Sequence, residues 1–255
     1  MLSLDLLSTL VLFGVVLAVG LAYCLRLIFK GRAQFDRVDK QGGSALLSKS
    51  LMEAAYWSMQ PLARLLVALR ISPNAISWTS LVFGAISGVS LAVGHFGFGA
   101  VFATLSAAMD SFDGRVARLR GMSSGAGQVL DSSVDRYVEF MFLGGLIVYY
   151  RDILALLILA LLAMIGSFMV SYSTAKAESL QVAPPKGSMR RPERGFYLTL
   201  GAALSPITIP WLETDGKFSV PMGHPMVMAL GLVAVVANVS AIERMVSIAR
   251  AARLR

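Results

Sequence analysis

Four aspartates lie within a span of 26 residues in a chain that is otherwise rich in apolar residues. Asp110 and Asp113 are three residues apart, and Asp131 and Asp135 are four apart. If both segments are helical, each pair shares one helix face. A short turn around residues 120–126 would make the two helices antiparallel and bring the pairs together. The spacing therefore predicts a single cluster of four carboxylates.

Such a cluster needs compensating positive charge. An unpaired aspartate at the centre of a membrane helix costs roughly 2.5–3.5 kcal/mol, and carboxylates at close range repel one another. Arg115, Arg118 and Arg136 are near enough in sequence to neutralise part of the charge. Oxygen donors without nearby His or Cys favour a hard cation, Mg²⁺ or Mn²⁺, and four carboxylates suit two ions. The alternative on spacing alone is a buried ion-pair network without metal.

The composition around the aspartates is that of a membrane protein. The 255 residues are 56% hydrophobic and 15% charged, whereas a soluble domain carries about 25% charged residues. Several apolar segments are long enough to cross a bilayer, which predicts an all-α integral membrane fold. The net charge of +8 comes from Lys and Arg at the ends of apolar segments. This pattern favours a lipid bilayer and excludes nucleic acid as the expected partner.

Two domains are expected, one of residues 1–47 and one of residues 48–255. The first contains an apolar stretch, Leu4 to Phe29, that is too long for the core of a signal peptide and starts beside Asp5 instead of a basic segment. We therefore predict a retained transmembrane anchor followed by a basic linker.

The second domain is predicted to hold an interfacial helix and six spanning helices. Residues 48–70 alternate apolar and basic residues at helical spacing, which is typical of a helix lying on a membrane surface; a soluble amphipathic helix is the alternative. Ser72 and Pro73 then provide a helix start. The six spans are predicted at 74–94, 97–119, 128–149, 152–177, 195–212 and 221–245.

The distribution of basic residues predicts the orientation. If the anchor enters from outside, the outer loops contain only Arg151 and Lys217 of the 23 Lys and Arg residues. The remaining basic residues then lie on the cytoplasmic side, as the positive-inside rule requires. The expected location is the cytoplasmic (inner) membrane, with the aspartates opening toward the cytoplasm.

The acidic segment matches the sequence pattern of a known family, and this makes its functional interpretation far more specific. Residues 110–135 match the pattern D-x2-D-G-x2-A-R-x8-G-x3-D-x3-D at all eight fixed positions, namely Asp110, Asp113, Gly114, Ala117, Arg118, Gly127, Asp131 and Asp135. This segment resembles the signature of the CDP-alcohol phosphotransferases, also called CDP-alcohol phosphatidyltransferases. The resemblance extends more loosely over the helices after residue 72 and does not include the anchor.

The resemblance implies a metal-dependent enzyme of phospholipid biosynthesis that transfers a phosphatidyl group from CDP-diacylglycerol, or a similar CDP-lipid, to an alcohol and releases CMP. It implies metal binding by Asp110, Asp113, Asp131 and Asp135, with Asp135 also the general base. It further implies binding of the CDP-lipid by Pro73, Asn74, Ala75, Ile76, Gly114, Ala117, Arg118 and Ser124. For Gly127 we expect close helix packing.

A basic cluster formed by Lys176, Lys186, Arg190, Arg191 and Arg194 concerns the acceptor. It lies on the predicted side where the aspartates open. Ordinary positive-inside anchoring is one interpretation. The other is an anion pocket for a phosphorylated alcohol, because Arg binds phosphate in a bidentate manner. Lys176, Arg191 and Arg194 are the predicted acceptor-binding residues.

Two short segments resemble the phosphatidylinositol-phosphate synthase branch of the family. That branch reads S-Y-x-K-A-R-A-E followed by R-P-E-R, and this chain has SYSTAKAE at residues 171–178 and RPER at 191–194. Thr174 stands in place of a Lys, and Lys176 in place of an Arg. Inositol phosphate is the leading acceptor, with glycerol 3-phosphate as the alternative and an unphosphorylated alcohol such as serine less favoured. The family also makes a homodimer an expectation.

Two further classes compete with the enzyme. Intramembrane acids often mark an ion path, as in a cation transporter, but a transporter usually places them near the midplane with access from both sides. A catalytically inactive homologue is the second, yet none of the four acids is missing. The glycine and arginine between the acids favour a nucleotide-binding enzyme.

Overall fold

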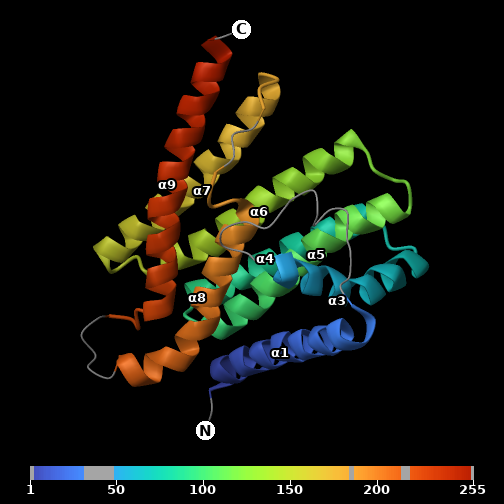
Figure 1. Ribbon diagram of the computed structural model, residues 1–255. Coiled ribbons are helices and arrows are strands. Elements are labelled where there is room, and N and C mark those ends of the chain that lie inside the picture. The colour runs from blue at the N-terminus through green and yellow to red at the C-terminus, as the bar shows by residue number, and fades with distance from the viewer. Residues whose placement is uncertain (1–2, 32–48, 184–186, 214–218, 254–255) are drawn as a thin grey trace. The chain divides into compact units, whose positions relative to one another are not determined.

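The computed structural model describes residues 3–31, 49–183, 187–213 and 219–253, and every regular element in these ranges is an α-helix. The predicted all-α fold is thus confirmed, while the basic linker from residue 32 to 47 lies outside the described residues. The helices are α1 (Leu4–Lys30), α3 (Lys49–Ala68), α4 (Pro73–Ala92), α5 (Phe96–Leu119), α6 (Gly125–Tyr149), α7 (Leu154–Ser179), α8 (Arg191–Leu212) and α9 (His224–Arg253) (Figure 1).

The six helices after residue 72 occur where the sequence predicts them, and two ends differ by more than three residues. Helix α8 begins at Arg191 instead of residue 195, because the backbone N–H of Arg190 donates to the Glu193 carboxylate at 3.1 Å and closes the first turn. Helix α9 continues to Arg253, beyond the predicted end at residue 245. Its apolar pattern stops earlier, but no proline or glycine interrupts the final polar turns.

Five helices are long and apolar enough to cross a membrane, namely α1, α4, α7, α8 and α9. They support an integral membrane protein. Helices α5 and α6 are not among them, although their 24 and 25 residues are long enough. The C-terminal half of α5 and the N-terminal half of α6 contain the aspartates and arginines of the motif, which lower the mean hydropathy. A span by α5 and α6 therefore remains a prediction.

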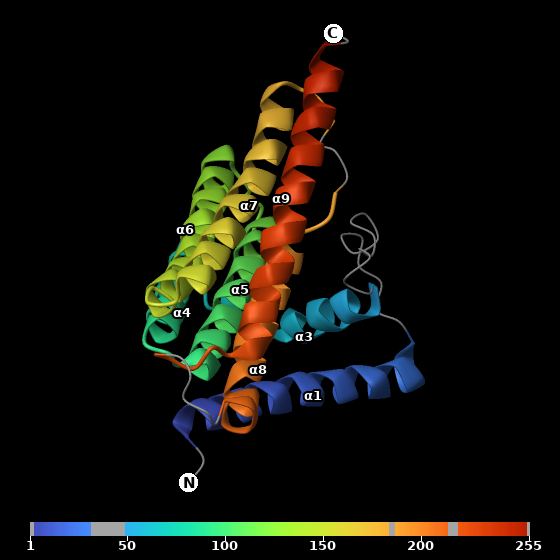
Figure 2. The same cartoon turned by 90° about the vertical axis from the view of Figure 1, so that its left-hand side faces the viewer.

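The chain divides into two compact units that are described separately. The first unit comprises residues 1–9, 83–104 and 136–255. Within it, α9 packs along α7 and α8 (Figure 2). The Asn238 side chain on α9 donates to the backbone oxygen of Leu162 on α7 at 2.8 Å. Gly166 lies beside that amide, so the glycine makes room for a polar contact between two apolar helices.

In the same unit, α4 and α6 touch backbone to backbone. A Cβ on Gly88 would collide with the Met141 carbonyl oxygen, and one on Gly145 would collide with the Gly88 carbonyl oxygen. Small residues allow this approach, which is how helices commonly associate in lipid. This contact holds the half of α6 that follows the aspartates.

The second unit comprises residues 10–82 and 105–135 and contains all four aspartates of the motif. Ser72 caps α4, since its Oγ accepts the backbone N–H of Ala75 at 3.2 Å, as predicted. The core of this unit joins α3, α4 and α5 through Ala63, Ile76, Phe112 and Val116. Helix α3 therefore buries one face against the helices that position the site.

Candidate metal and nucleotide site

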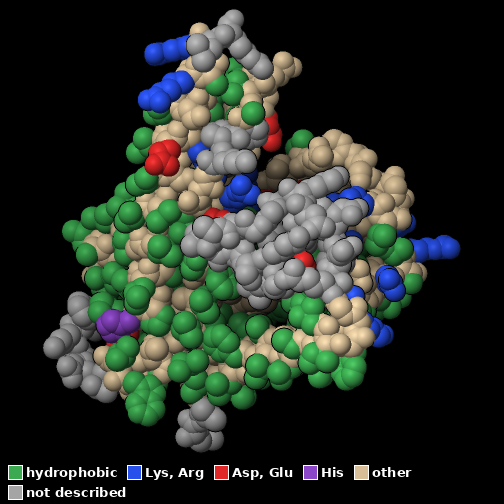
Figure 3. All heavy atoms as spheres, viewed as in Figure 1, with side chains coloured by type: hydrophobic (Ala, Val, Ile, Leu, Met, Phe, Trp, Pro, Cys, Tyr) green, Lys and Arg blue, Asp and Glu red, His purple; other side chains and the backbone are tan. Residues whose placement is uncertain are grey.

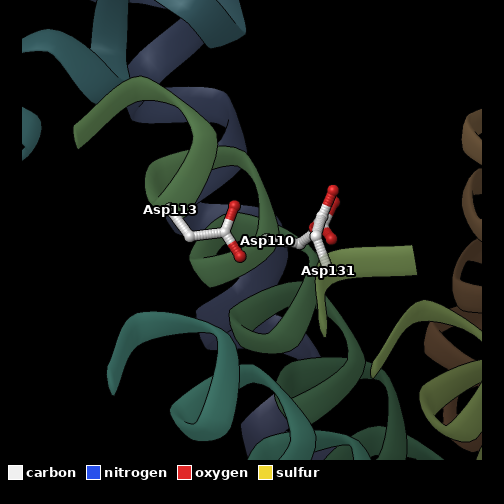
Figure 4. Close-up of side chains that lie close together, drawn as sticks. All are labelled: Asp110, Asp113 and Asp131. Atoms are coloured by element: carbon white, nitrogen blue, oxygen red, sulfur yellow. The ribbon is translucent and has the colours of Figure 1, made fainter. Parts of the chain in front are cut away.

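Three of the four aspartates converge. Carboxylate oxygens of Asp110, Asp113 and Asp131 lie within 4.8 Å of one another. Figure 4 shows the Asp113 side chain on α5 directed toward Asp110 of the same helix and Asp131 of α6. Asp135, one turn further along α6, is half-buried and lies outside this group of three. The predicted cluster of four carboxylates is thus confirmed for three of them.

Ser77 on α4 anchors the buried member of the cluster. Its hydroxyl donates a hydrogen bond of 2.6 Å to Oδ2 of Asp113, whose side chain is 5% exposed. The other oxygen, Oδ1, accepts the backbone N–H of Gly114. Both oxygens of Asp113 are thus oriented by neutral donors, which bring no positive charge to the cluster. Nothing in the sequence distinguishes Ser77 from the other hydroxyl residues of α4.

The donor set fits a hard divalent cation. Three carboxylates within 4.8 Å supply only oxygen ligands, which suit Mg²⁺ or Mn²⁺ better than the softer metals that prefer His and Cys. A positive ion between them would also relieve their mutual repulsion. Among the described residues this is the only group of three or more acidic, His or Cys side chains with that spacing.

Gly114 and Arg118 are one helical turn apart on α5. A Cβ on Gly114 would lie 3.2 Å from Nη1 of Arg118, so the glycine leaves space for the guanidinium beside the backbone. Arg118 itself is exposed, while Ala117 is half-buried. Arg115 instead reaches toward α3, where it donates to the Tyr56 carbonyl at 3.1 Å and stacks 4.9 Å from the centre of the Tyr56 ring.

Ser124 and Gly127 lie at the start of α6. The exposed hydroxyl of Ser124 accepts the Gly127 backbone N–H at 3.1 Å and so caps the helix. Among the described residues, this hydroxyl is the only atom within 4 Å of a Cβ built on Gly127. The expectation that Gly127 allows close helix packing is therefore wrong. Gly127 instead leaves room for the Ser124 hydroxyl that caps α6.

The predicted segment Pro73–Ile76 forms the first turn of α4. Asn74 and Ala75 are exposed there, Pro73 is half-buried, and Ile76 is buried in the core with α3 and α5. Ser77, which holds Asp113, follows directly. The start of α4 is thus joined to the aspartate cluster within one compact unit.

The predicted acceptor-binding residues belong to the other unit and differ in environment. Lys176 is exposed near the end of α7, and Arg191 is half-buried at the start of α8. Arg194 is buried and forms an ion pair of 2.7 Å with Glu139 on α6. Lys186 lies outside the described residues.

Glu139 of this unit was not identified from the sequence. Glu139 follows Asp131 and Asp135 at the same four-residue interval, a signal that could have identified it. Thr174, which stands where the related branch has Lys, lies 3.4 Å from Nη1 of Arg244. Arg244 is buried and also donates to the Gly187 carbonyl at 3.1 Å.

Comparisons with known proteins identify the family to which the chain is similar. The family model described as CDP-alcohol phosphatidyltransferase matches residues 70–239. The phosphatidylinositol phosphate synthase of Corynebacterium glutamicum is 31% identical over 160 residues, 60% of this chain and 72% of the relative. That of Streptomyces avermitilis is 28% identical over 228 residues, 87% of this chain and 88% of the relative.

Solved structures show the same fold. The phosphatidylinositol phosphate synthase of Mycobacterium tuberculosis with CDP-DAG bound is 25% identical, with a TM-score of 0.63 over 74% of this chain and 92% of that chain. The same enzyme in complex with manganese and citrate gives a TM-score of 0.64, over 74% of this chain and 88% of the other. The matched region contains the aspartate cluster and the whole eight-residue motif. The chain belongs to the CDP-alcohol phosphatidyltransferase family and is an integral membrane phosphatidyltransferase.

Proposed function

We propose that this protein transfers the phosphatidyl group of CDP-diacylglycerol to the hydroxyl of a phosphorylated polar alcohol, with inositol phosphate as the leading acceptor, and releases CMP. The convergence of Asp110, Asp113 and Asp131 within the family motif carries the proposal. The CDP-DAG in a matched structure supports the donor. The names of the matched relatives, phosphatidylinositol phosphate synthases, support the acceptor.

We assign the metal to the four aspartates of the motif, Asp110, Asp113, Asp131 and Asp135. Mg²⁺ or Mn²⁺ fits their oxygen donors, and four carboxylates have the capacity for two ions. The manganese in a matched structure supports this assignment. When bound, the metal would neutralise the pyrophosphate of the donor and make CMP a better leaving group.

The chain itself would supply the proton transfer. Asp135 would accept the proton of the acceptor hydroxyl. The hydroxyl oxygen would then form a bond to the β-phosphorus on the lipid side, while the bond from that phosphorus to the bridging oxygen breaks and CMP leaves with the electron pair. Ser77 would keep Asp113 oriented throughout, because its hydrogen bond fixes one carboxylate oxygen.

The cytidine nucleotide would lie along the start of α4 and the second half of α5. Gly114 would allow it to approach the helix backbone, and the exposed guanidinium of Arg118 would bind the diphosphate. The remaining proposed contacts are Pro73, Asn74, Ala75, Ile76, Ala117 and Ser124. Ser124 would offer its hydroxyl while its oxygen also caps α6.

For the acceptor phosphate we propose Lys176, Arg191 and Arg194. The exposed ammonium of Lys176 is open to a ligand. The presence of Thr174 in place of a Lys removes one positive charge from the related pocket, and this observation favours glycerol 3-phosphate as the second candidate acceptor.

The proposed setting follows the charge distribution. Residues 1–47 would form the anchor and linker, and residues 48–255 the interfacial helix and catalytic domain. The site would face the cytoplasm from the inner membrane, since the basic residues cluster at that end of the helices. A homodimer is proposed from the family resemblance.

The decisive experiment incubates the purified protein with CDP-diacylglycerol, Mg²⁺ or Mn²⁺, and one acceptor at a time, with detection of CMP and identification of the lipid product by mass spectrometry. The acceptors are inositol phosphate, inositol, glycerol 3-phosphate and serine. We expect phosphatidylinositol phosphate as the main product. A product only with glycerol 3-phosphate would replace the leading acceptor, and absence of CMP with every acceptor would refute the proposal.

A further inference from the structure

Two adjoining cavities lie between α1 and α3, outside the region that the family model matches. Their volumes are about 450 and 310 Å³, and both are lined by Ala22 and Trp57. We call them together the α1–α3 groove. All its residues belong to one compact unit. The groove is therefore built from residues that the family model does not match.

The two helices that form the groove are held together by specific contacts. The Tyr23 hydroxyl on α1 donates to Oε2 of Glu53 on α3 at 3.1 Å, and both side chains are buried. The rings of Tyr23 and Trp57 lie 5.7 Å apart. Beside these contacts α1 lines the first cavity with Ala18, Val19 and Ala22, and the two small alanine side chains leave the space open.

The groove combines an apolar floor with positive charge. Val19, Ala22, Leu25 and Phe29 supply apolar surface, and the hydrophobic face over α1 is visible in Figure 3. Arg26 and Lys30 line the cavity at the end of α1, while Arg64 lines the other cavity. An apolar groove with basic side chains beside it matches a molecule that has an acyl chain and an anionic head group.

The cations of the groove have donors to spare. Arg26 donates one N–H to the carbonyl of Gly31, at 2.9 Å. A guanidinium has five N–H donors, so others can bind a ligand. Within the described part of the chain, Lys30 and Arg64 make no hydrogen bond or ion pair. Basic groups at the cytoplasmic end of membrane helices bind anionic lipid head groups.

We propose that the α1–α3 groove binds one anionic phospholipid of the surrounding membrane. Its acyl chain lies along Ala18 and Ala22 beside Trp57, and its phosphate is held by Arg26 and Lys30. The occupant comes from the bilayer because α1 is a candidate span whose most apolar window is only 6% buried inside the protein. This site is independent of the proposed transfer reaction.

Trp57 provides a direct probe, because it lines both cavities. The double variant Trp78→Phe/Trp211→Phe leaves Trp57 as the single tryptophan, and both replaced side chains are exposed. The full-length protein is reconstituted with phosphatidylglycerol or phosphatidylcholine brominated on the acyl chains, and quenching of Trp57 fluorescence is measured. We expect stronger quenching by brominated phosphatidylglycerol at equal mole fraction.

Variants then separate the site from general lipid contact. Arg26→Gln/Lys30→Gln should remove the preference for phosphatidylglycerol, at about fivefold in affinity per cation. Arg250→Gln/Arg253→Gln on α9 removes the same charge from exposed positions and should retain it. Ala22→Phe fills the groove and should reduce quenching, whereas Cys24→Phe adds the same ring at an exposed position of α1 and should not.

Three results would overturn the proposal. Equal quenching by both head groups would mean ordinary contact with bulk lipid. A preference that survives Arg26→Gln/Lys30→Gln would place the head group elsewhere. Stronger quenching by brominated CDP-diacylglycerol than by brominated phosphatidylglycerol would identify the occupant as the donor substrate. If Ala22→Phe prevents folding, the charge variants alone decide between these results.

Discussion

The guanidinium of Arg194 and the carboxylate of Glu139 form a two-point ion pair inside the protein. Nε lies 2.7 Å from Oε1, and Nη2 lies 3.1 Å from Oε2. Arg194 is only 1% exposed and also donates to the Met189 carbonyl at 2.7 Å and to Ser171 Oγ at 3.2 Å. One side chain thus joins α6, α7 and the segment before α8.

Arg194→Ala should lower the free energy of unfolding by about 3–5 kcal/mol, because it leaves the Glu139 carboxylate buried without its partner. Thermal unfolding in detergent measures the change, and Arg191→Ala, at a half-buried position, should have a much smaller effect. Unchanged unfolding would contradict the structural role of the ion pair, while a raised KM for the acceptor in the same variant would support the proposed contact of Arg194 with the acceptor phosphate.

Ser77→Ala should weaken divalent metal binding about 10- to 100-fold, the usual effect of removing a residue that orients a metal ligand. The physical reason is the loss of the 2.6 Å hydrogen bond that holds Asp113. Transferase activity as a function of Mn²⁺ concentration reports the change. Thr79→Ala is the matched control, since that hydroxyl bonds only within its own helix, to the Ala75 carbonyl. An equal dependence on Mn²⁺ concentration in both variants would show that Ser77 does not support metal binding.

Asp135→Asn should abolish phosphatidyl transfer while the protein stays folded, because an amide cannot accept the proton of the acceptor hydroxyl. CMP release, together with the thermal unfolding curve, checks this result. Substantial remaining activity would exclude Asp135 as the general base.

Removal of divalent cations with EDTA should stop CMP release, and Mn²⁺ or Mg²⁺ should restore it. The binding of Mn²⁺, followed by electron paramagnetic resonance, should be strongly reduced in Asp131→Asn, which removes one of the three converging carboxylates. Asp152→Asn, an exposed acid paired with Arg151, is the control and should bind Mn²⁺ like the unaltered protein. Activity that is insensitive to EDTA would contradict the metal assignment.

Gly114→Ala should raise the KM for the CDP-lipid, since the new Cβ would lie 3.2 Å from Nη1 of Arg118 and displace the guanidinium. Gly125→Ala is the control, because a Cβ there meets open space. Steady-state kinetics with varied CDP-diacylglycerol distinguishes the two variants. Equal KM values would show that the nucleotide does not approach Gly114.

The helices were largely predictable because the sequence marks their starts. Ser72 and Pro73 open α4, and the hydroxyl bonds as a cap should. The two aspartate pairs were predictable for a similar reason, since spacings of three and four residues place side chains on one helix face whatever surrounds the helix. Local rules were sufficient for both features.

The contacts between distant segments were not predictable. Ser77 looks like Thr79 in the sequence, yet one hydroxyl reaches Asp113 on another helix and the other bonds its own helix. Arg194 and Glu139 are 55 residues apart. Nothing in the RPER segment indicates that this arginine is buried or that it pairs with Glu139.

The low apolarity of α5 and α6 has a consequence for biogenesis. Of the helices after residue 72, these two enter the lipid least readily by themselves, because each carries acids that cost roughly 2.5–3.5 kcal/mol at full depth. They are expected to leave the translocon as a hairpin, sheltered by the neighbouring apolar helix α4, whose Ser77 contacts Asp113. The residues proposed for catalysis would then set the order of membrane insertion, and a charge-neutralising substitution would speed insertion as it removes activity.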